Sequence, residues 1–66
     1  MVTTRIKALQ LRNNDRILGG DKVFTVTNFQ MVIREDVVTY HLTDAAGVTT
    51  PRWAAMDSII TKVVVA

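Results

Sequence analysis

Apolar and polar residues alternate with a period of two through most of this 66-residue chain. Between Thr4 and Ala8, the apolar residues Ile6 and Ala8 point to one side of an extended strand, while Arg5 and Lys7 point to the other. The segments are rich in β-branched Val, Ile and Thr, which fit a pleated sheet better than a helix. The pattern therefore predicts an all-β fold of short, half-buried strands.

Turn-forming residues divide the chain into five or six such strands. Gly19-Gly20 predicts a tight hairpin turn, because glycine accepts the positive φ that two-residue turns require. Asp44 opens a second turn, with Gly47 at its natural positive-φ position. Pro51 has no backbone N–H to donate, so we expect its strand to lie at a sheet edge or to end there.

The alternation slips by one residue at Asn28. Val26 belongs to the apolar register before this point, and Phe29 begins the opposite register after it. One extra residue of this kind is typical of a β-bulge or a sharp bend. We therefore predict one long, bent strand over residues 22–34, with two strands joined at Asn28 as the alternative.

Residues 53–58 combine two conflicting signals. Trp53, Met56 and Ile60 lie at the spacing of one helical face. Residues 59–65 are nearly all β-branched, which favours a strand. We expect one helical turn near residues 53–58, followed by a final strand over residues 59–65.

The small size of the chain limits how it is stabilised. The sequence has no cysteine and one histidine, so disulfides are excluded, and no metal site or cofactor is expected. Apolar residues make up 48% of the chain, more than a domain this small can hide, so we predict self-association through an exposed apolar patch. Candidates on the outer strand faces are Val32, Val37 and either Val63 or Val64.

The chain shows no signal for a membrane or for export. No apolar segment approaches the ~20 residues that a membrane-spanning helix needs. The N-terminal MVTTRIKAL lacks the apolar core of a secretory signal peptide. We therefore expect a cytoplasmic protein that does not bind a membrane.

The order of these elements resembles the Src-homology-3-like small β-barrel family, which includes the Tudor and KOW modules. The matching segments are RIKAL, LRNNDRILGGD, VFTVTNFQMVIREDVVTYHLTD, VTTP and IITKVVV, and they cover nearly the whole chain. The resemblance implies a single barrel over residues 1–66 that binds partners through its loops and nearby aromatic side chains. Short, cysteine-free β proteins of this style also resemble bacteriophage products, which implies a host factor as the partner and the host cytoplasm as the location.

The only histidine, His41, has an acidic neighbour three residues on, Asp44. A catalytic site also needs a nucleophile or a cradle for developing charge, and a cavity of ~300 Å³ or more. A barrel of this length filled by its own side chains has little room for one. We therefore predict no catalytic residues, and we interpret His41 as part of an outer sheet face and Asp44 as a turn residue.

Arg52-Trp53 is the strongest candidate for a binding site. Arg and Trp are enriched at binding hot spots, where Trp supplies a large contact area. We expect Arg52, Trp53 and Arg34 to contact a protein partner. The alternative is that Trp53 closes one end of the barrel, with Met56 and Ile60 beneath it.

Basic residues are concentrated in the first third of the chain. Residues 1–20 carry a net charge of +3 and the remainder carries −1. The cations concerned are Arg5, Lys7, Arg12 and Arg16. One interpretation is a solvated strand face and loop. The other, an alternative function, is weak, salt-dependent binding of nucleic acid phosphates, with Trp53 or Phe29 as a stacking platform.

Overall fold

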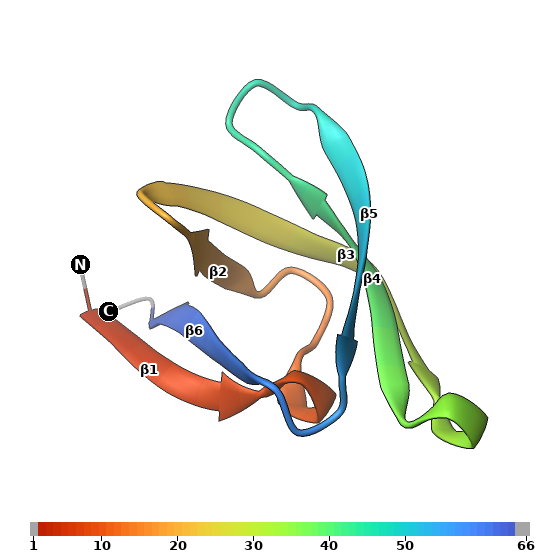
Figure 1. Ribbon diagram of the computed structural model, residues 1–66. Helices are drawn as coiled ribbons and strands as arrows, with labels where there is room; N and C mark the ends of the chain where they lie inside the picture. Colours follow the sequence, from red (N-terminus) through yellow and green to blue (C-terminus); the bar gives the residue numbers. More distant parts are fainter. Residues whose placement is uncertain (1, 65–66) are drawn as a thin grey trace.

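The computed structural model describes residues 2–64, which form one antiparallel sheet and two single turns of 3-10 helix (Figure 1). The strands are β1 (Val2–Lys7), β2 (Arg16–Gly19), β3 (Lys22–Val32), β4 (Val37–Thr43), β5 (Thr49–Ala55) and β6 (Ile59–Val64). The 3-10 turns are η1 (Ala8–Gln10) and η2 (Ile33–Glu35). The all-β prediction is confirmed, and no helix in the described range is long and apolar enough to cross a membrane.

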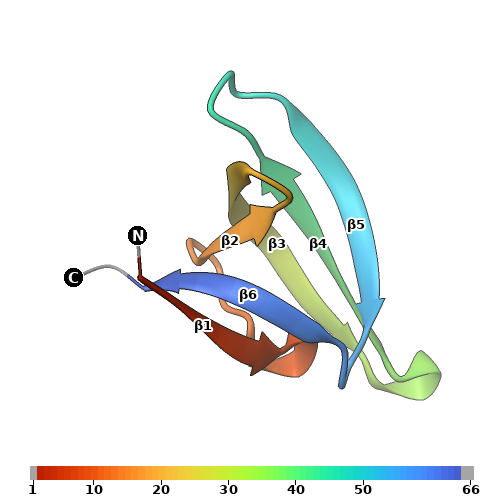
Figure 2. The ribbon, with the colours of Figure 1, turned by 60° about the vertical axis from the view of Figure 1, so that its left-hand side comes forward.

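The six strands lie in the order β1-β6-β2-β3-β4-β5. The sheet curls so that its β1–β6–β2 half turns toward its β4–β5 half (Figure 2). Among the described residues β1 and β5 each pair with one neighbour, so the sheet is open and the expected closed barrel is wrong in this respect. After β1 the chain enters η1, which meets the β5–β6 turn, where Leu9 N donates to Met56 O at 2.9 Å.

Strand β3 bends at Asn28, where the alternation of the sequence slips. Thr27 pairs with His41 but Gln30 pairs with Thr39, so β3 holds one extra residue against β4. Asn28 has a φ of 51°, a left-handed conformation that Asn tolerates better than most residues. The single bent strand is confirmed and the two-strand alternative is wrong. The strand ends two residues before the predicted boundary because η2 follows it.

Residues 13–15, in the loop before β2, form hydrogen bonds with β3 next to this bend. Asn13 Oδ1 accepts a hydrogen bond from Phe29 N at 2.9 Å, directly after the bulge. Asn14 N donates to Val26 O, and Val26 N donates to Asp15 O, both at 2.8 Å. The Asn13 side chain thus satisfies the N–H of Phe29 beside the bulge, and the bonds of Asn14 and Asp15 continue the β2–β3 ladder to Val26.

The β2–β3 hairpin turns one residue later than expected. Gly19 pairs with Lys22, which leaves Gly20 and Asp21 as the turn residues. Gly20 has the positive φ, 66°, that the prediction required of a glycine here. Gly19 serves a different purpose, because a Cβ at this position would lie 2.8 Å from Cε1 of Phe24.

The second turn forms as predicted. Asp44 Oδ1 accepts hydrogen bonds from Ala46 N and Val48 N, both at 2.9 Å. Gly47 adopts a φ of 84°. Pro51 lies within β5, the strand at one edge of the described sheet, as its missing N–H predicts.

Residues 53–58 contain no helical turn, which corrects the prediction for this segment. β5 continues to Ala55, and a short turn follows in which Ser58 N donates to Ala55 O at 3.0 Å. Met56 N donates to Asp36 O at 2.9 Å and so extends the β4–β5 ladder beyond the strand. The hydrogen bonds to β4 keep this segment extended, although its apolar side chains have the spacing of a helix.

The final strand, β6, forms as expected up to its last described residue, and residue 65 of the predicted range lies outside the described residues. The four Val candidates for an exposed patch differ. Val32 and Val37 are half-buried, Val64 is exposed, and Val63 is buried.

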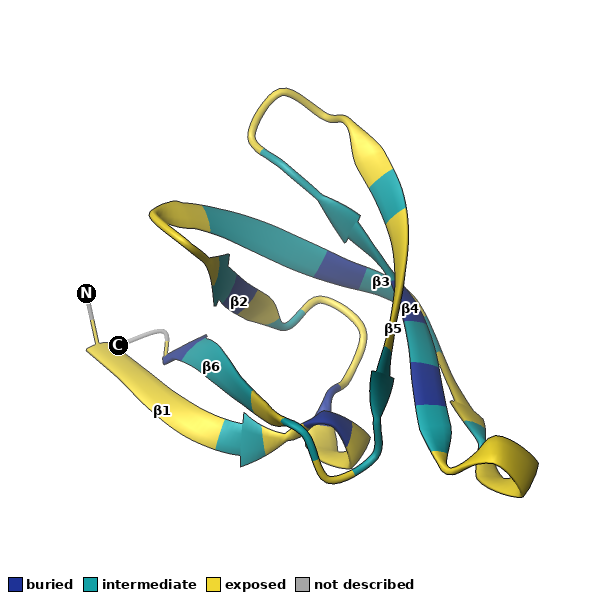
Figure 3. Cartoon of the chain, in the orientation of Figure 1, coloured by how far each residue is buried: buried dark blue, intermediate teal, exposed yellow. Residues whose placement is uncertain are grey.

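The core is filled by residues of η1 and of the loop after it as well as by strands (Figure 3). Its buried cluster consists of Ala8, Leu11, Ile17, Val26, Val38 and Tyr40. Around it pack the half-buried side chains Ile6, Phe24, Phe29, Leu42, Ala54, Met56 and Ile60. Leu11 follows η1, and together with Val26 and Val38 it is among the largest fully buried side chains.

Candidate functional site

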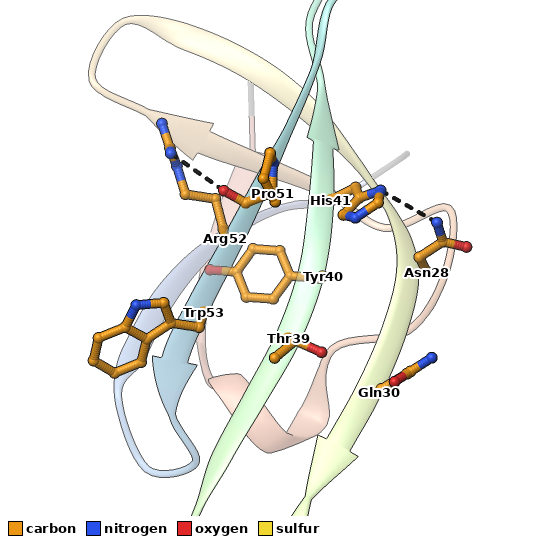
Figure 4. A pocket seen from close by; sticks show the side chains of 8 residues that line it. All are labelled: Asn28, Gln30, Thr39, Tyr40, His41, Pro51, Arg52 and Trp53. Carbon is orange, nitrogen blue, oxygen red and sulfur yellow. Dashed lines mark hydrogen bonds between the residues drawn. The ribbon is translucent and has the colours of Figure 1, made fainter.

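The outer face of β4 and β5 presents Trp53, whose side chain is 71% exposed (Figure 4). Residues paired across strands share a face, and Trp53 pairs with Thr39, which pairs with Gln30. The core residues Val38 and Tyr40 flank Thr39 along β4, so Trp53 lies on the face that points away from the core. The interpretation in which Trp53 closes the barrel is therefore wrong.

Two shallow hollows meet at Trp53. The larger, of about 690 Å³, is lined by Asn28, Gln30, Thr39, Tyr40, His41, Pro51, Arg52 and Trp53. The smaller, of about 440 Å³, is lined by Glu35, Val37, Thr39 and Trp53. Trp53 and Thr39 belong to both, so a ligand in either hollow contacts the indole.

Arg52 and Trp53 are adjacent on β5 but do not share a face. Arg52 pairs with the core residue Tyr40, and its Nη1 donates to Pro51 O at 3.4 Å. In Figure 4 the side chains of Arg52 and Trp53 diverge from β5. Arg34 lies exposed in η2, at the end of the sheet where β5 finishes. The structure thus brings Arg34 to the Trp53 end of the sheet and turns Arg52 away from the indole.

His41 lies half-buried on the outer face, opposite Pro51 and beside the bulge. Asn28 Nδ2 lies 3.2 Å from Nδ1 of His41, and because an amide nitrogen only donates, Nδ1 accepts this bond. Asp44 is occupied by its own turn. Within residues 2–64 no three His, Cys, Asp or Glu side chains come together as a metal site would require.

Burial raises the pKa of Tyr40 above its ordinary value, and the nearby positive charge of Arg52 lowers it by a smaller amount. The folded protein therefore holds the phenol proton more tightly than the unfolded chain does. By linkage, the Tyr40 contribution to stability is fully present below about pH 10, the ordinary pKa, and is lost as the pH rises through the raised value.

We expect the free energy of unfolding to fall more steeply above about pH 10 in the wild type than in Tyr40→Phe. Urea denaturation at a series of pH values measures both slopes. Tyr40 is the only tyrosine, so the absorbance of tyrosinate reports its pKa directly. A titration midpoint at the ordinary value in the folded protein would contradict this prediction.

Three of the four basic candidates share one face at the other side of the sheet. Thr3, Arg5 and Lys7 alternate along one face of β1. Arg16 joins them, because it pairs with Val63, which pairs with Thr3. All three cations are exposed.

The fourth basic candidate and the predicted stacking platforms lie elsewhere. Arg12 sits in the loop after η1, and its Nη1 donates to Leu11 O at 2.7 Å. Trp53 is on β5, at the opposite end of the strand order from β1. Phe29 is half-buried against the core. The basic face therefore lacks the neighbouring aromatic that the nucleic-acid interpretation expects.

Of the residues around Trp53, Gln30, Glu35 and Thr39 were not predicted as site residues, and Val37 was predicted only as part of an exposed apolar patch. A signal for Val37 and Thr39 was present, because they alternate with the core residues of β4 and so occupy its outer face. Glu35 carried no such signal. Its position beside Trp53 depends on how β3, β4 and β5 align.

Comparison of the chain with protein-family models, with curated proteins and with solved structures finds no match. The resemblances to Src-homology-3-like barrels and to bacteriophage products therefore stay predictions. The function must be argued from the Trp53 face and the basic face themselves.

Proposed function

We propose that this chain is a non-enzymatic module that binds a protein partner through the outer face around Trp53. The observation that carries this proposal is the exposure of the only Trp of a small domain. Burying the rest of an indole typically stabilises a structure by about 2–3 kcal/mol, a gain that the isolated fold leaves unused. A partner that covers Trp53 recovers this free energy.

The backbone of β5 supports the same function. On either side of β5, Met56 N donates to Asp36 O and Val48 O accepts from Asp44 N. Backbone groups alternate in direction along a strand, so the even-numbered residues of β5 direct their N–H and C=O groups to β4. Trp53 therefore directs its N–H and C=O outward at the sheet edge, where a partner strand could pair. Pro51 has no N–H and limits such pairing to the Trp53 end. The indole thus sits on a rigid, already ordered strand, which lowers the entropic cost of binding.

Substitution of Trp53 by alanine tests this function. We expect Trp53→Ala to fold like the wild type and to bind the captured partner at least about 30-fold more weakly, as truncation of a hot-spot residue does. Immobilised protein captures partners from a cell extract, and titration of the captured protein gives the affinity. The matched control is Ile59→Ala, because Ile59 is a comparably exposed apolar residue, at 62%, on another strand. Equal capture by wild type and Trp53→Ala would count against the proposal.

A second function, weak binding of nucleic acid, is favoured by the shared face of Arg5, Lys7 and Arg16. Phosphate contacts by these cations give an affinity that falls steeply with salt and does not depend on base sequence. Titration with fluorescent oligonucleotides at ~50 and ~200 mM salt measures it. Binding at the lower salt that Arg5→Ala weakens and Trp53→Ala leaves intact would support this second function.

A further inference from the structure

The smaller hollow beside Trp53 combines apolar surface with one negative charge. Trp53 and Val37 form its apolar walls, and Glu35 contributes a carboxylate. Within residues 2–64 the only ion pair joins Lys62 to Asp15, at 3.3 Å. Glu35 lines the hollow, and its carboxylate forms no ion pair with a cation from the described part of its own chain.

An arginine side chain matches these walls. A guanidinium stacks on the face of an indole and forms paired hydrogen bonds with a carboxylate. Its three methylene groups cover apolar surface such as that of Val37. Trp53, Val37 and Glu35 thus present the contacts for the head and the stem of one basic side chain.

The same end of the sheet also presents an arginine. Arg34 precedes Glu35 in η2 and is exposed. Consecutive residues of a helical turn point in different directions, so Arg34 does not fold back onto Glu35. Val32 pairs with Val37, and Val37 pairs with Ala55, which places η2 at the end of the sheet where Trp53 lies. Each copy therefore carries a donor arginine next to a receiving hollow.

We propose that a second copy of this chain occupies the hollow, with Arg34 of each copy placed between Trp53 and Glu35 of the other. The inference rests on the proposed function, since it uses the Trp53 face and names its partner. A two-fold axis makes the interface self-complementary, because each copy gives and receives one arginine.

Exposure and charge both favour a second copy as the occupant. Ile33, at 75%, and Trp53 are the two most exposed large apolar side chains among the described residues, and both lie at this end of the sheet. Arg34 and Glu35 carry opposite charges and are adjacent in η2. A second copy related by a two-fold axis can therefore place each charge against its opposite, and covering exposed apolar side chains stabilises the pair.

Charge reversal tests the dimer, with sedimentation equilibrium up to about 1 mM protein as the measurement. We expect the wild type to associate into a pair of 7.4 kDa chains. Arg34→Glu and Glu35→Arg should each raise the dimer Kd at least about tenfold, because each places like charges together twice per dimer. The double variant Arg34→Glu/Glu35→Arg should return to within about threefold of the wild type.

Mixing the two single variants gives the sharpest result. In a mixed pair, the glutamate introduced in one copy would meet the arginine introduced in the other, and the unaltered Arg34 and Glu35 would meet in the second hollow. We therefore expect an equimolar mixture of Arg34→Glu and Glu35→Arg to dimerise although neither variant does so alone. Only contacts between copies predict this recovery. The control is Lys22→Glu, an exposed charge reversal at the start of β3, which should leave the Kd unchanged.

Trp53 fluorescence supplies an independent readout, because it is the only Trp. Its emission should shift to shorter wavelength as the wild type is concentrated, and should not shift in Glu35→Arg. A wild type that stays monomeric at about 1 mM overturns the dimer, as does a mixture that fails to recover it. If such a monomer still loses its captured partner on Trp53→Ala, the protein-binding function stands without the dimer. If Trp53→Ala changes neither the affinity for the captured partner nor the dimer Kd, both proposals are wrong.

Discussion

Replacing Leu11 with alanine is expected to destabilise the protein by about 3 kcal/mol, within the range of ~2–5 kcal/mol found for buried leucines. Leu11 has no exposed surface and packs in the core cluster with Val26 and Val38. Alanine removes the apolar contacts and leaves a cavity that the hydrogen-bonded strands around it close only in part.

This loss is large compared with the total stability of so short a chain. A core of this size supplies no more than about 3–5 kcal/mol, so Leu11→Ala should keep at most about 2 kcal/mol and show a measurable unfolded fraction at room temperature. Urea denaturation followed by circular dichroism measures the difference. Leu9→Ala is the matched control, since Leu9 is a leucine of the adjacent η1 turn with 36% of its surface exposed. We expect it to lose less than about 1 kcal/mol, and equal losses in the two variants would show that Leu11 is not a core residue.

Asn28→Val is expected to destabilise the protein by about 2–3 kcal/mol, from strain at its φ of 51° and from the lost hydrogen bond to His41. A β-branched side chain is a poor fit to the left-handed region. The strand cannot relax into a regular one, because removal of the bulge would turn Phe29 to the opposite face of β3.

The control for this position is Asn28→Gly. Glycine adopts the same φ without strain and loses only the hydrogen bond, so we expect a change within about 1 kcal/mol. Thermal denaturation of the wild type and both variants measures the difference. Equal stability of the valine and glycine variants would mean that the bulge at Asn28 is not required.

The candidate site was predicted in part. Trp53 stood out as the only Trp, and Arg34 was named with it. Arg52 was grouped with Trp53 because the two are adjacent in sequence, yet successive residues of a strand point to opposite faces. Glu35 was missed because Trp53, which shares the hollow with it, is brought there by the pairing of β4 with β5 and not by sequence spacing.

The amino-acid sequence by itself determined the β class, the bend at Asn28, the turns near Gly20 and Gly47, and the edge position of Pro51. Each of these depends on a property of a short segment or of one residue: a period of two, tolerance of positive φ, or a missing N–H. Such properties act locally, so they are readable without knowing the fold.

Only the tertiary structure decided which side chains are buried and which meet. Leu11 follows a short 3-10 turn and nonetheless packs in the core, whereas Trp53, in a regular strand, points outward. The helical spacing of residues 53–58 also gave way to ladder bonds from β4. Burial and contact depend on how the sheet curls and on the register between distant strands, and the alternation of one strand indicates only which residues share a face.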